Sequence, residues 1–289
     1  MANQRNRGII CIILSSLSFA FMALFLRMAG DLPSIEKSFF RNLVSAVFAF
    51  IMLVRSKERF HIRKKENLYL FILRSLAGTL GIFCNFYAVD HLLLSDASCL
   101  NKLSPFFVIV FSYFLLREKI TLFQSGCVAA AFIGSLFIIK PSFASSSLGA
   151  SVIGFLGGMS AGFAYACVRK LGVRGERGPM IVLFFSLFSM IACIPFMIAD
   201  FHPISGQQIV FLLLTGLAAA GGQFGITAAY TYAPAREISV YDYSQIMFSA
   251  IMGFFFFGQV PDGWSFVGYI VIVIAGVTMF FYNKKHGGD

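Results

Sequence analysis

The chain has 289 residues, of which 58% are hydrophobic and only 12% are charged, and its mean hydropathy is +0.81. A soluble globular domain carries about 25% charged residues, so this composition excludes a soluble protein and indicates a single integral membrane domain. The net charge of +10 would favour nucleic-acid binding in a soluble protein. Here most basic residues lie in short segments between apolar runs, so we expect a lipid bilayer around the chain and no nucleic-acid partner.

Apolar runs follow one another along the chain, each close to the ~20 residues that cross a bilayer as a helix. The sequence therefore predicts an all-α integral membrane fold with ten transmembrane helices. No cleavage pattern of small residues follows the first run, so we expect that run to be retained as a span. The predicted spans are residues 8–26, 38–54, 68–89, 96–116, 120–139, 149–168, 179–199, 207–231, 238–258 and 263–282.

The distribution of charge predicts the topology. If the N-terminus is cytoplasmic, the inner segments hold most of the Lys and Arg residues, including six between Arg55 and Lys65. The outer segments then hold few basic residues beyond Arg27, Lys37 and Lys140, and their other charges are acidic. Because cytoplasmic loops carry the excess of Lys and Arg, both termini are predicted to be cytoplasmic, in a multi-pass protein of the cell membrane.

The chain also contains an internal repeat. Residues 8–140 align with residues 149–281 at a shift of 141, and the clearest stretch begins at Leu73 and Leu214, where five of eleven positions are identical. About one identity is expected by chance. Five spans per copy force the copies to cross the bilayer in opposite directions, as in many secondary transporters. The sequence predicts two inverted five-helix repeats, 8–140 and 149–282, joined by a short polar linker at 141–148.

The fourth span carries a recognisable pattern. The first copy reads YAVDHLLLSDASCLNKLSPFFVIVFSYFLLREKIT from Tyr87, with Ser104-Pro105 inside the helix and Glu118 after the apolar run. Pro105 has no backbone N–H and is expected to kink the span. The second copy departs from this pattern, because Gln245-Ile246 replaces Ser-Pro and Gln259 replaces the Glu.

These residues, together with the Arg41-Asn42 pair in the second span, resemble the ten-span members of the drug/metabolite transporter superfamily that contain two EamA-type repeats. The resemblance covers nearly the whole chain. It implies a transporter in which spans three, four, eight and nine line a central cavity, with spans five and ten outside. It does not specify the substrate, because members carry amino acids, nucleotides, sugars, amines and metabolite conjugates.

Charged residues inside a bilayer cost at least ~2.5–3.5 kcal/mol each on insertion scales, so each one needs a reason. The predicted spans contain Arg41, Arg74, Lys102 and Asp242. Counted from the predicted span ends, Arg41 and Lys102 lie near the outer face, and Arg74 and Asp242 near the inner face. We therefore expect Asp242 to pair with Arg74 rather than with Lys102, as a cytoplasmic gate. Snorkelling to the interface is the alternative for the three cations.

Polar residues at helical spacing form stripes along the third, fourth, eighth and ninth spans, and lipid-facing positions would not be polar at this density. Tyr230 on the eighth span and Tyr241 on the ninth span could stack on a substrate and hydrogen-bond with it. The remaining candidates for substrate binding or gating are Asn85, Asn101, Tyr230, Tyr241 and Gln245. For Gly154, Gly158 and Gly162 we expect close helix packing instead.

Together these features predict a secondary transporter, a permease or exporter, that moves a small organic metabolite by alternating access around a central cavity. Three cations against one acidic residue in the spans favour a substrate with a carboxylate or phosphate, such as an amino acid or metabolite conjugate. Amines or cationic compounds that bind Asp242 are the alternative. No ATP-binding loop motif is present, which leaves proton coupling through Asp242 or passive exchange.

A membrane-embedded enzyme that acts on lipid-linked substrates is the less favoured reading. It would need an acid–base or metal constellation near an interface, but the four His residues lie in loops or the C-terminal tail. We therefore expect no enzyme activity, no cofactor and no metal. Ten spans can enclose a site within one chain, so a monomer suffices, and a dimer stays open.

Overall fold

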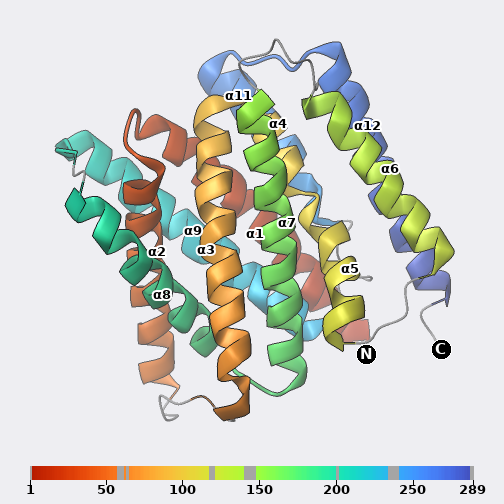
Figure 1. The fold of residues 1–289 in the computed structure, drawn as a ribbon, viewed down its shortest axis with the longest axis horizontal. Coiled ribbons are helices and arrows are strands. Elements are labelled where there is room, and N and C mark those ends of the chain that lie inside the picture. Colours follow the sequence, from red (N-terminus) through yellow and green to blue (C-terminus); the bar gives the residue numbers. More distant parts are fainter. Residues whose placement is uncertain are drawn as a thin grey trace.

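The computed structural model describes residues 2–56, 62, 65–116, 121–139, 148–199, 202–233 and 241–286, and these residues contain helices but no strand (Figure 1). The helices are α1 (Ala2–Met28), α2 (Ser34–Arg55), η1 (Lys65–Asn67), α3 (Leu68–His91), α4 (Leu94–Asn101), α5 (Ser104–Leu116), α6 (Leu122–Ile139), α7 (Leu148–Val173), α8 (Gly178–Ala199), α9 (Gly206–Tyr232), α11 (Ser244–Phe257) and α12 (Gly263–His286).

The all-α membrane fold is confirmed. Eight helical segments of the described chain, with α4 and α5 counted as one, are long and apolar enough to cross a membrane. Two shorter apolar helices, Leu122–Gly134 and Ser244–Phe257, occupy the places of the predicted fifth and ninth spans. The start of α1 and the end of α12 lie at the same end of the bundle, as an even number of crossings requires (Figure 1). The total of ten spans and the cytoplasmic side remain predictions.

The pattern of helix packing stays the same when each helix is replaced by its counterpart in the other repeat. The shift of 141 matches α1 with α7, α2 with α8, α3 with α9, α4–α5 with the ninth span and α6 with α12. In the structure α1 packs on α9, and their counterparts α7 and α3 pack on each other in the same way. In the pairs α2–α8 and α6–α12, each helix packs on its own counterpart in the other repeat. In addition, α1 and α7 begin at opposite ends of the bundle (Figure 1), which is the arrangement of inverted repeats.

Small residues allow these helices to approach closely. A Cβ on Gly157 of α7 would lie 3.0 Å from Cys84 Cβ of α3, and a Cβ on Gly222 of α9 would lie 2.6 Å from the Phe19 ring of α1. The close packing predicted for the three glycines of α7 is confirmed, because a Cβ there would meet Ala88 or backbone oxygens of the fourth span. These glycines are Gly154, Gly158 and Gly162.

The fourth span is interrupted near its middle, as Pro105 predicts. Helix α4 ends at Asn101 and α5 begins at Ser104, because Pro105 has no N–H to continue the ladder of hydrogen bonds. The ninth span is interrupted as well, although it has no proline. Tyr243, the counterpart of Lys102 at the shift of 141, is a turn residue immediately before α11. Both repeats therefore bring a helix break toward the middle of the bundle.

Some predicted features lie outside the described residues. These are residues 141–147 of the predicted linker, and Glu118, Pro234 and Ala235 of the EamA-type pattern.

Candidate functional site

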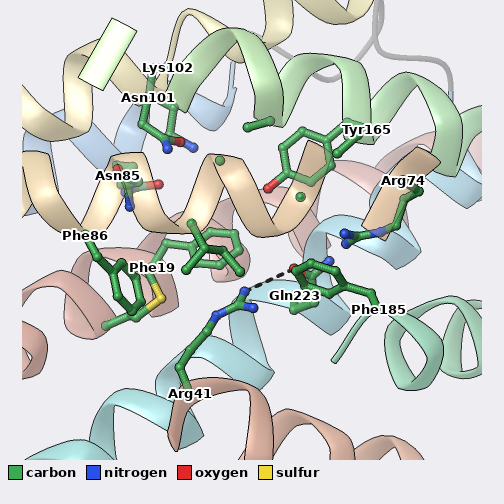
Figure 2. Close-up of a pocket in the computed structure, with 17 residues that line it drawn as sticks. Phe19, Arg41, Arg74, Asn85, Phe86, Asn101, Lys102, Tyr165, Phe185 and Gln223 are labelled. Atoms are coloured by element: carbon green, nitrogen blue, oxygen red, sulfur yellow. Dashed lines mark hydrogen bonds between the residues drawn. The ribbon is translucent and has the colours of Figure 1, made fainter. Parts of the chain in front are cut away.

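A cavity of about 60 Å³ lies in the centre of the bundle and is lined by both repeats (Figure 2). That volume admits several water molecules. Its apolar wall includes Phe19, Phe86 and Phe185. Its polar lining consists of Arg41, Arg74, Asn85, Asn101, Lys102, Tyr165, Gln223 and Gln245.

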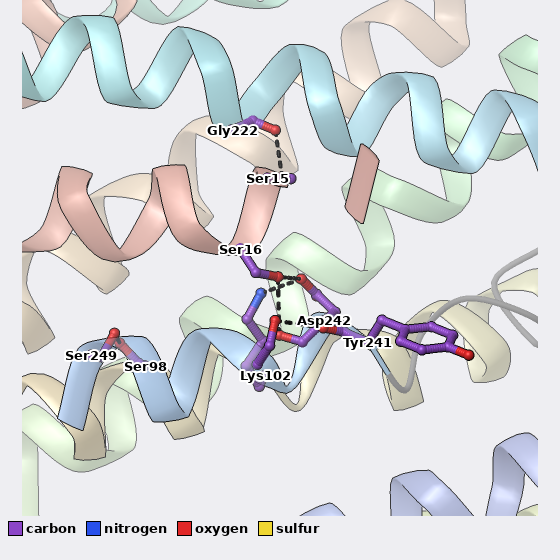
Figure 3. Close-up of polar contacts among 9 residues, drawn as sticks. Ser15, Ser16, Ser98, Lys102, Gly222, Tyr241, Asp242 and Ser249 are labelled. Atoms are coloured by element: carbon purple, nitrogen blue, oxygen red, sulfur yellow. Dashed lines mark hydrogen bonds and ion pairs between the residues drawn. The ribbon is translucent and has the colours of Figure 1, made fainter. Parts of the chain in front are cut away.

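The structure brings most of the sequence-predicted candidates to this cavity and leaves three away from its lining. Tyr230 lies behind the wall, with its ring 5.6 Å from that of Tyr165. Tyr241 packs against Phe280 of α12, with ring centres 5.6 Å apart, and its ring points away from Lys102 and Asp242 (Figure 3). Asp242 is fully buried beside the cavity. The predicted candidates that line the cavity are Arg41, Arg74, Asn85, Asn101, Lys102 and Gln245.

Two arginines meet on one aromatic ring. The guanidinium carbon of Arg74 lies 3.6 Å from the centre of the Phe185 ring, and that of Arg41 lies 5.5 Å from it. Arg41 Nη1 donates to Asn42 Oδ1 at 2.8 Å, and Arg41 Nη2 donates to Gln223 Oε1 at 3.2 Å. Three helices, α2, α3 and α9, thus hold the two cations against α8.

Among the described residues, the two guanidinium groups have no acidic partner. Arg41 and Arg74 are only 3% and 2% exposed, so they lie inside the bundle rather than reaching an interface as snorkelling requires. Arg41 Nε, Arg74 Nε and Arg74 Nη1 are buried without a hydrogen-bond partner. Burying an ion costs several kcal/mol, whereas a cation–π contact returns about 0.5–2 kcal/mol. Since no acidic residue is among those that line the cavity, the arrangement leaves a positive potential suited to an anion.

Gly78 makes the stacking of Arg74 possible. It lies one helical turn after Arg74 on α3, and it lines the cavity. A Cβ at this position would meet Arg74 Nη1 and would come within 2.7 Å of Phe185 Cε2. The glycine therefore provides the space in which the guanidinium and the ring lie face to face.

The third cation that lines the cavity, Lys102, forms an ion pair with Asp242. Lys102 Nζ lies 2.7 Å from Asp242 Oδ1, and the two side chains are 2% and 1% exposed. Ser16 of α1 also donates to Asp242 Oδ1 at 2.8 Å (Figure 3). The expectation that Asp242 pairs with Arg74 was wrong. It counted depth along uninterrupted helices, but Lys102 and Asp242 both lie at the helix breaks, where the two repeats meet.

Polar contacts also fix the half-helix α4. The backbone N–H of Leu94, its first residue, donates to Gln259 Oε1 at 3.1 Å. The hydroxyl of Tyr269 on α12 donates to Asp96 Oδ1 at 2.6 Å, and Ser98 Oγ donates to Ser249 Oγ of α11 at 2.7 Å. The position of the break, and with it that of Lys102, is therefore held from α11 and α12.

Sequence reasoning missed Tyr165 and Phe185 as cavity residues. Phe185 is one of 36 Phe residues, and nothing in its neighbourhood distinguishes it from those that face lipid. Tyr165 did carry a signal, because it is a tyrosine in the interior of α7 one turn after Gly162, away from the interfaces where Tyr usually collects.

Comparisons with known proteins agree with this architecture. A sequence profile of the EamA-like transporter family matches the chain twice, over residues 6–140 and 148–282. The chain belongs to the EamA-like transporter family. This EamA-like transporter is 30% identical to the pseudopaline exporter CntI of Pseudomonas aeruginosa, over 94% of this chain and 95% of the relative. The resemblance to the drug/metabolite transporter superfamily is thereby confirmed.

Two more distant relatives of this EamA-like transporter are also transport proteins by name. Solute carrier family 35 member G1 of Mus musculus is 27% identical over 93% of this chain and 76% of the relative. The riboflavin transporter of Vibrio cholerae is 25% identical over 96% of this chain and 95% of the relative. A crystal structure that is 14% identical has the same fold, with a TM-score of 0.71 over 96% of this chain and 98% of its own.

These comparisons establish the general role. The EamA-like transporter is a multi-pass protein of the cell membrane that transports a small molecule. The prediction of a transporter rather than an enzyme is confirmed, because the family and the named relatives are transporters.

Proposed function

We propose that this transporter carries a small organic anion, with a carboxylate or phosphate group, through the central cavity by alternating access. The observation that carries the proposal is the pair Arg41 and Arg74, buried against Phe185 with no acidic residue among those that line the cavity. Guanidinium groups bind carboxylate and phosphate through charge-assisted hydrogen bonds, which are about twice as strong as neutral ones.

The place of the cavity supports alternating access. Its lining comes from α1, α2, α3 and the fourth span of the first repeat, and from α7, α8, α9 and α11 of the second. A site between inverted repeats can open to either face when one repeat rocks against the other. The interrupted fourth and ninth spans meet at this site, and broken helices are frequent at such sites.

The alternative substrate, an amine or another cation, has less support. It would require a free carboxylate in the cavity, but Asp242 does not line the cavity and its Oδ1 accepts from both Lys102 and Ser16. An amine would also have to approach two buried arginines.

We propose export as the direction of transport. The support is the name of the 30% identical relative, which is an exporter. The excess of basic residues between the second and third spans supports a cytoplasmic position for that connection, and in export the substrate enters the cavity from the cytoplasmic side.

The test is flux of radiolabelled organic anions in proteoliposomes that contain the purified protein. We expect anion flux that Arg41→Gln and Arg74→Gln each reduce by at least about tenfold, because a hydrogen bond to a charged group contributes ~1.5–3 kcal/mol. Arg55→Gln, at the exposed end of the same helix α2 as Arg41, is the matched control and should leave the flux unchanged. Flux of amines that disappears in Asp242→Asn would contradict the proposal.

A further inference from the structure

The charged side chains around the cavity indicate how many negative charges the substrate must carry. Three cationic side chains line the cavity: Arg41, Arg74 and Lys102. Lys102 is paired with Asp242 at 2.7 Å, and both side chains are almost completely buried. The remaining two cations, on Arg41 and Arg74, form no ion pair with any described residue.

The geometry makes the two arginines one unit. Both guanidinium carbons lie within 5.5 Å of the centre of the same Phe185 ring, although they come from different helices, α2 and α3. Arg41 uses Nη1 and Nη2 on Asn42 and Gln223 and keeps a free Nε, whereas Arg74 keeps a free Nε and Nη1. Each arginine thus retains N–H groups that no described residue uses as hydrogen-bond donors.

We propose that the substrate is a dianion, a dicarboxylate or a phosphomonoester, whose two negative charges neutralise Arg41 and Arg74 while Lys102 stays bound to Asp242. This inference rests on the proposed function. A monoanion would leave one uncompensated positive charge in the closed bundle, and a buried unpaired charge is strongly unfavourable. A phosphomonoester satisfies the count because it carries about −1.5 to −2 at neutral pH.

Asp242 argues against a third substrate charge. It already supplies the carboxylate that Lys102 needs, and Ser16 donates to the same oxygen. A trianion would have to displace a carboxylate that belongs to the protein and that is fully buried. The protein therefore neutralises Lys102 itself, and it leaves Arg41 and Arg74 for the substrate to neutralise.

The opposite side of the cavity accepts the rest of the molecule. Figure 2 shows Asn85 and Asn101 together beside Lys102, on the side away from Arg74 and Phe185. Amide side chains both donate and accept hydrogen bonds and carry no charge. The two charges of the proposed substrate therefore face Arg41 and Arg74, and an uncharged polar part of a larger substrate can extend toward Asn85 and Asn101.

The experiment compares matched ligand pairs with the purified transporter at neutral pH. Succinate is paired with its monoamide, succinamate, and a phosphomonoester is paired with its methyl diester, so that each pair differs by about one charge. Ligand-dependent rise of the thermal midpoint gives affinity, and counterflow in proteoliposomes gives transport. We expect the dianion of at least one pair to be preferred by about tenfold or more. The two pairs distinguish carboxylate from phosphate.

Variants test whether the substrate carries two negative charges. Arg41→Gln leaves one uncompensated cation and should bring the preference for the dianion close to unity or invert it. The control Arg55→Gln should keep the wild-type preference. The double variant Lys102→Met with Asp242→Asn removes both charges of the ion pair and should also keep it, whatever its absolute rate.

The outcomes separate the two proposals. If the two members of each pair bind and move equally well in the wild type, the count of two is wrong while anion transport stands. If the Lys102/Asp242 double variant loses the preference, Lys102 is a substrate cation and the count is also wrong. If neither member of either pair binds or moves, the proposed function itself fails.

Discussion

Replacing Asp242 with Asn removes one charge of the ion pair that joins the two interrupted helices. At 2.7 Å and an effective dielectric constant of about 20, the Coulomb attraction between Lys102 and Asp242 is about 6 kcal/mol before the cost of desolvation. Removing one partner of a buried pair leaves the other charge uncompensated, and typically costs ~3–5 kcal/mol. We expect Asp242→Asn and Lys102→Met each to destabilise the fold by that amount.

The double variant decides whether this reasoning is correct. Replacing both partners leaves no buried charge, so Lys102→Met with Asp242→Asn should cost clearly less than the sum of the single changes. The measurement is unfolding by sodium dodecyl sulfate in mixed micelles, with the free energy of unfolding determined for all four proteins of the cycle. Costs that add within about 0.5 kcal/mol would refute a direct interaction between the two side chains.

Three further outcomes follow from the same contacts. Arg74→Met should stabilise the ligand-free protein by roughly 1–3 kcal/mol, because it removes a buried charge with two unpartnered nitrogens, and it should abolish anion flux; a loss of stability in the same unfolding assay would contradict this. Gly78→Ala should raise the half-saturating substrate concentration, since its Cβ displaces Arg74 and Phe185; unchanged binding would show that the stack is dispensable. Tyr269→Phe leaves the Asp96 carboxylate without that donor and should destabilise the fold by about 1–3 kcal/mol, whereas Phe266→Leu on the exposed side of α12 should have little effect on unfolding.

The sequence predicts the spans well because apolar length and the positions of turns are local properties. The third span was predicted at 68–89 and α3 covers Leu68–His91; the seventh was predicted at 179–199 and α8 covers Gly178–Ala199. The break at Pro105 was also predictable, since proline removes a backbone donor. The break at Tyr243 was not, because Ile246 stands where the first repeat has Pro105, and nothing local distinguishes that segment from a continuous helix.

The site was harder to predict because it depends on side-chain direction and on contacts across the bundle. The sequence makes both Tyr241 and Asp242 candidates for substrate binding or gating, but neighbouring residues on a helix do not share a face. In the structure Tyr241 packs on Phe280 while Asp242 binds Lys102, a residue 140 positions away. An unpaired arginine is a property of the folded state, since only the structure shows that none of the described acidic residues pairs with Arg74.

The exchange of partners between the repeats has a consequence for how the protein is made. The main packing partner of α1 is α9, that of α2 is α8, that of α3 is α7, and that of α6 is α12, so the first repeat packs chiefly on helices of the second. Between the end of α1 and the start of α9 the ribosome must add almost 180 residues, which takes roughly 10–40 s at 5–20 residues per second. During that time the first spans sit in the bilayer with their polar and glycine-rich faces uncovered. Biogenesis therefore depends on holding early spans in the membrane until their partners arrive, and a chain cut after the first repeat should be degraded unless the second half is supplied in the same cell.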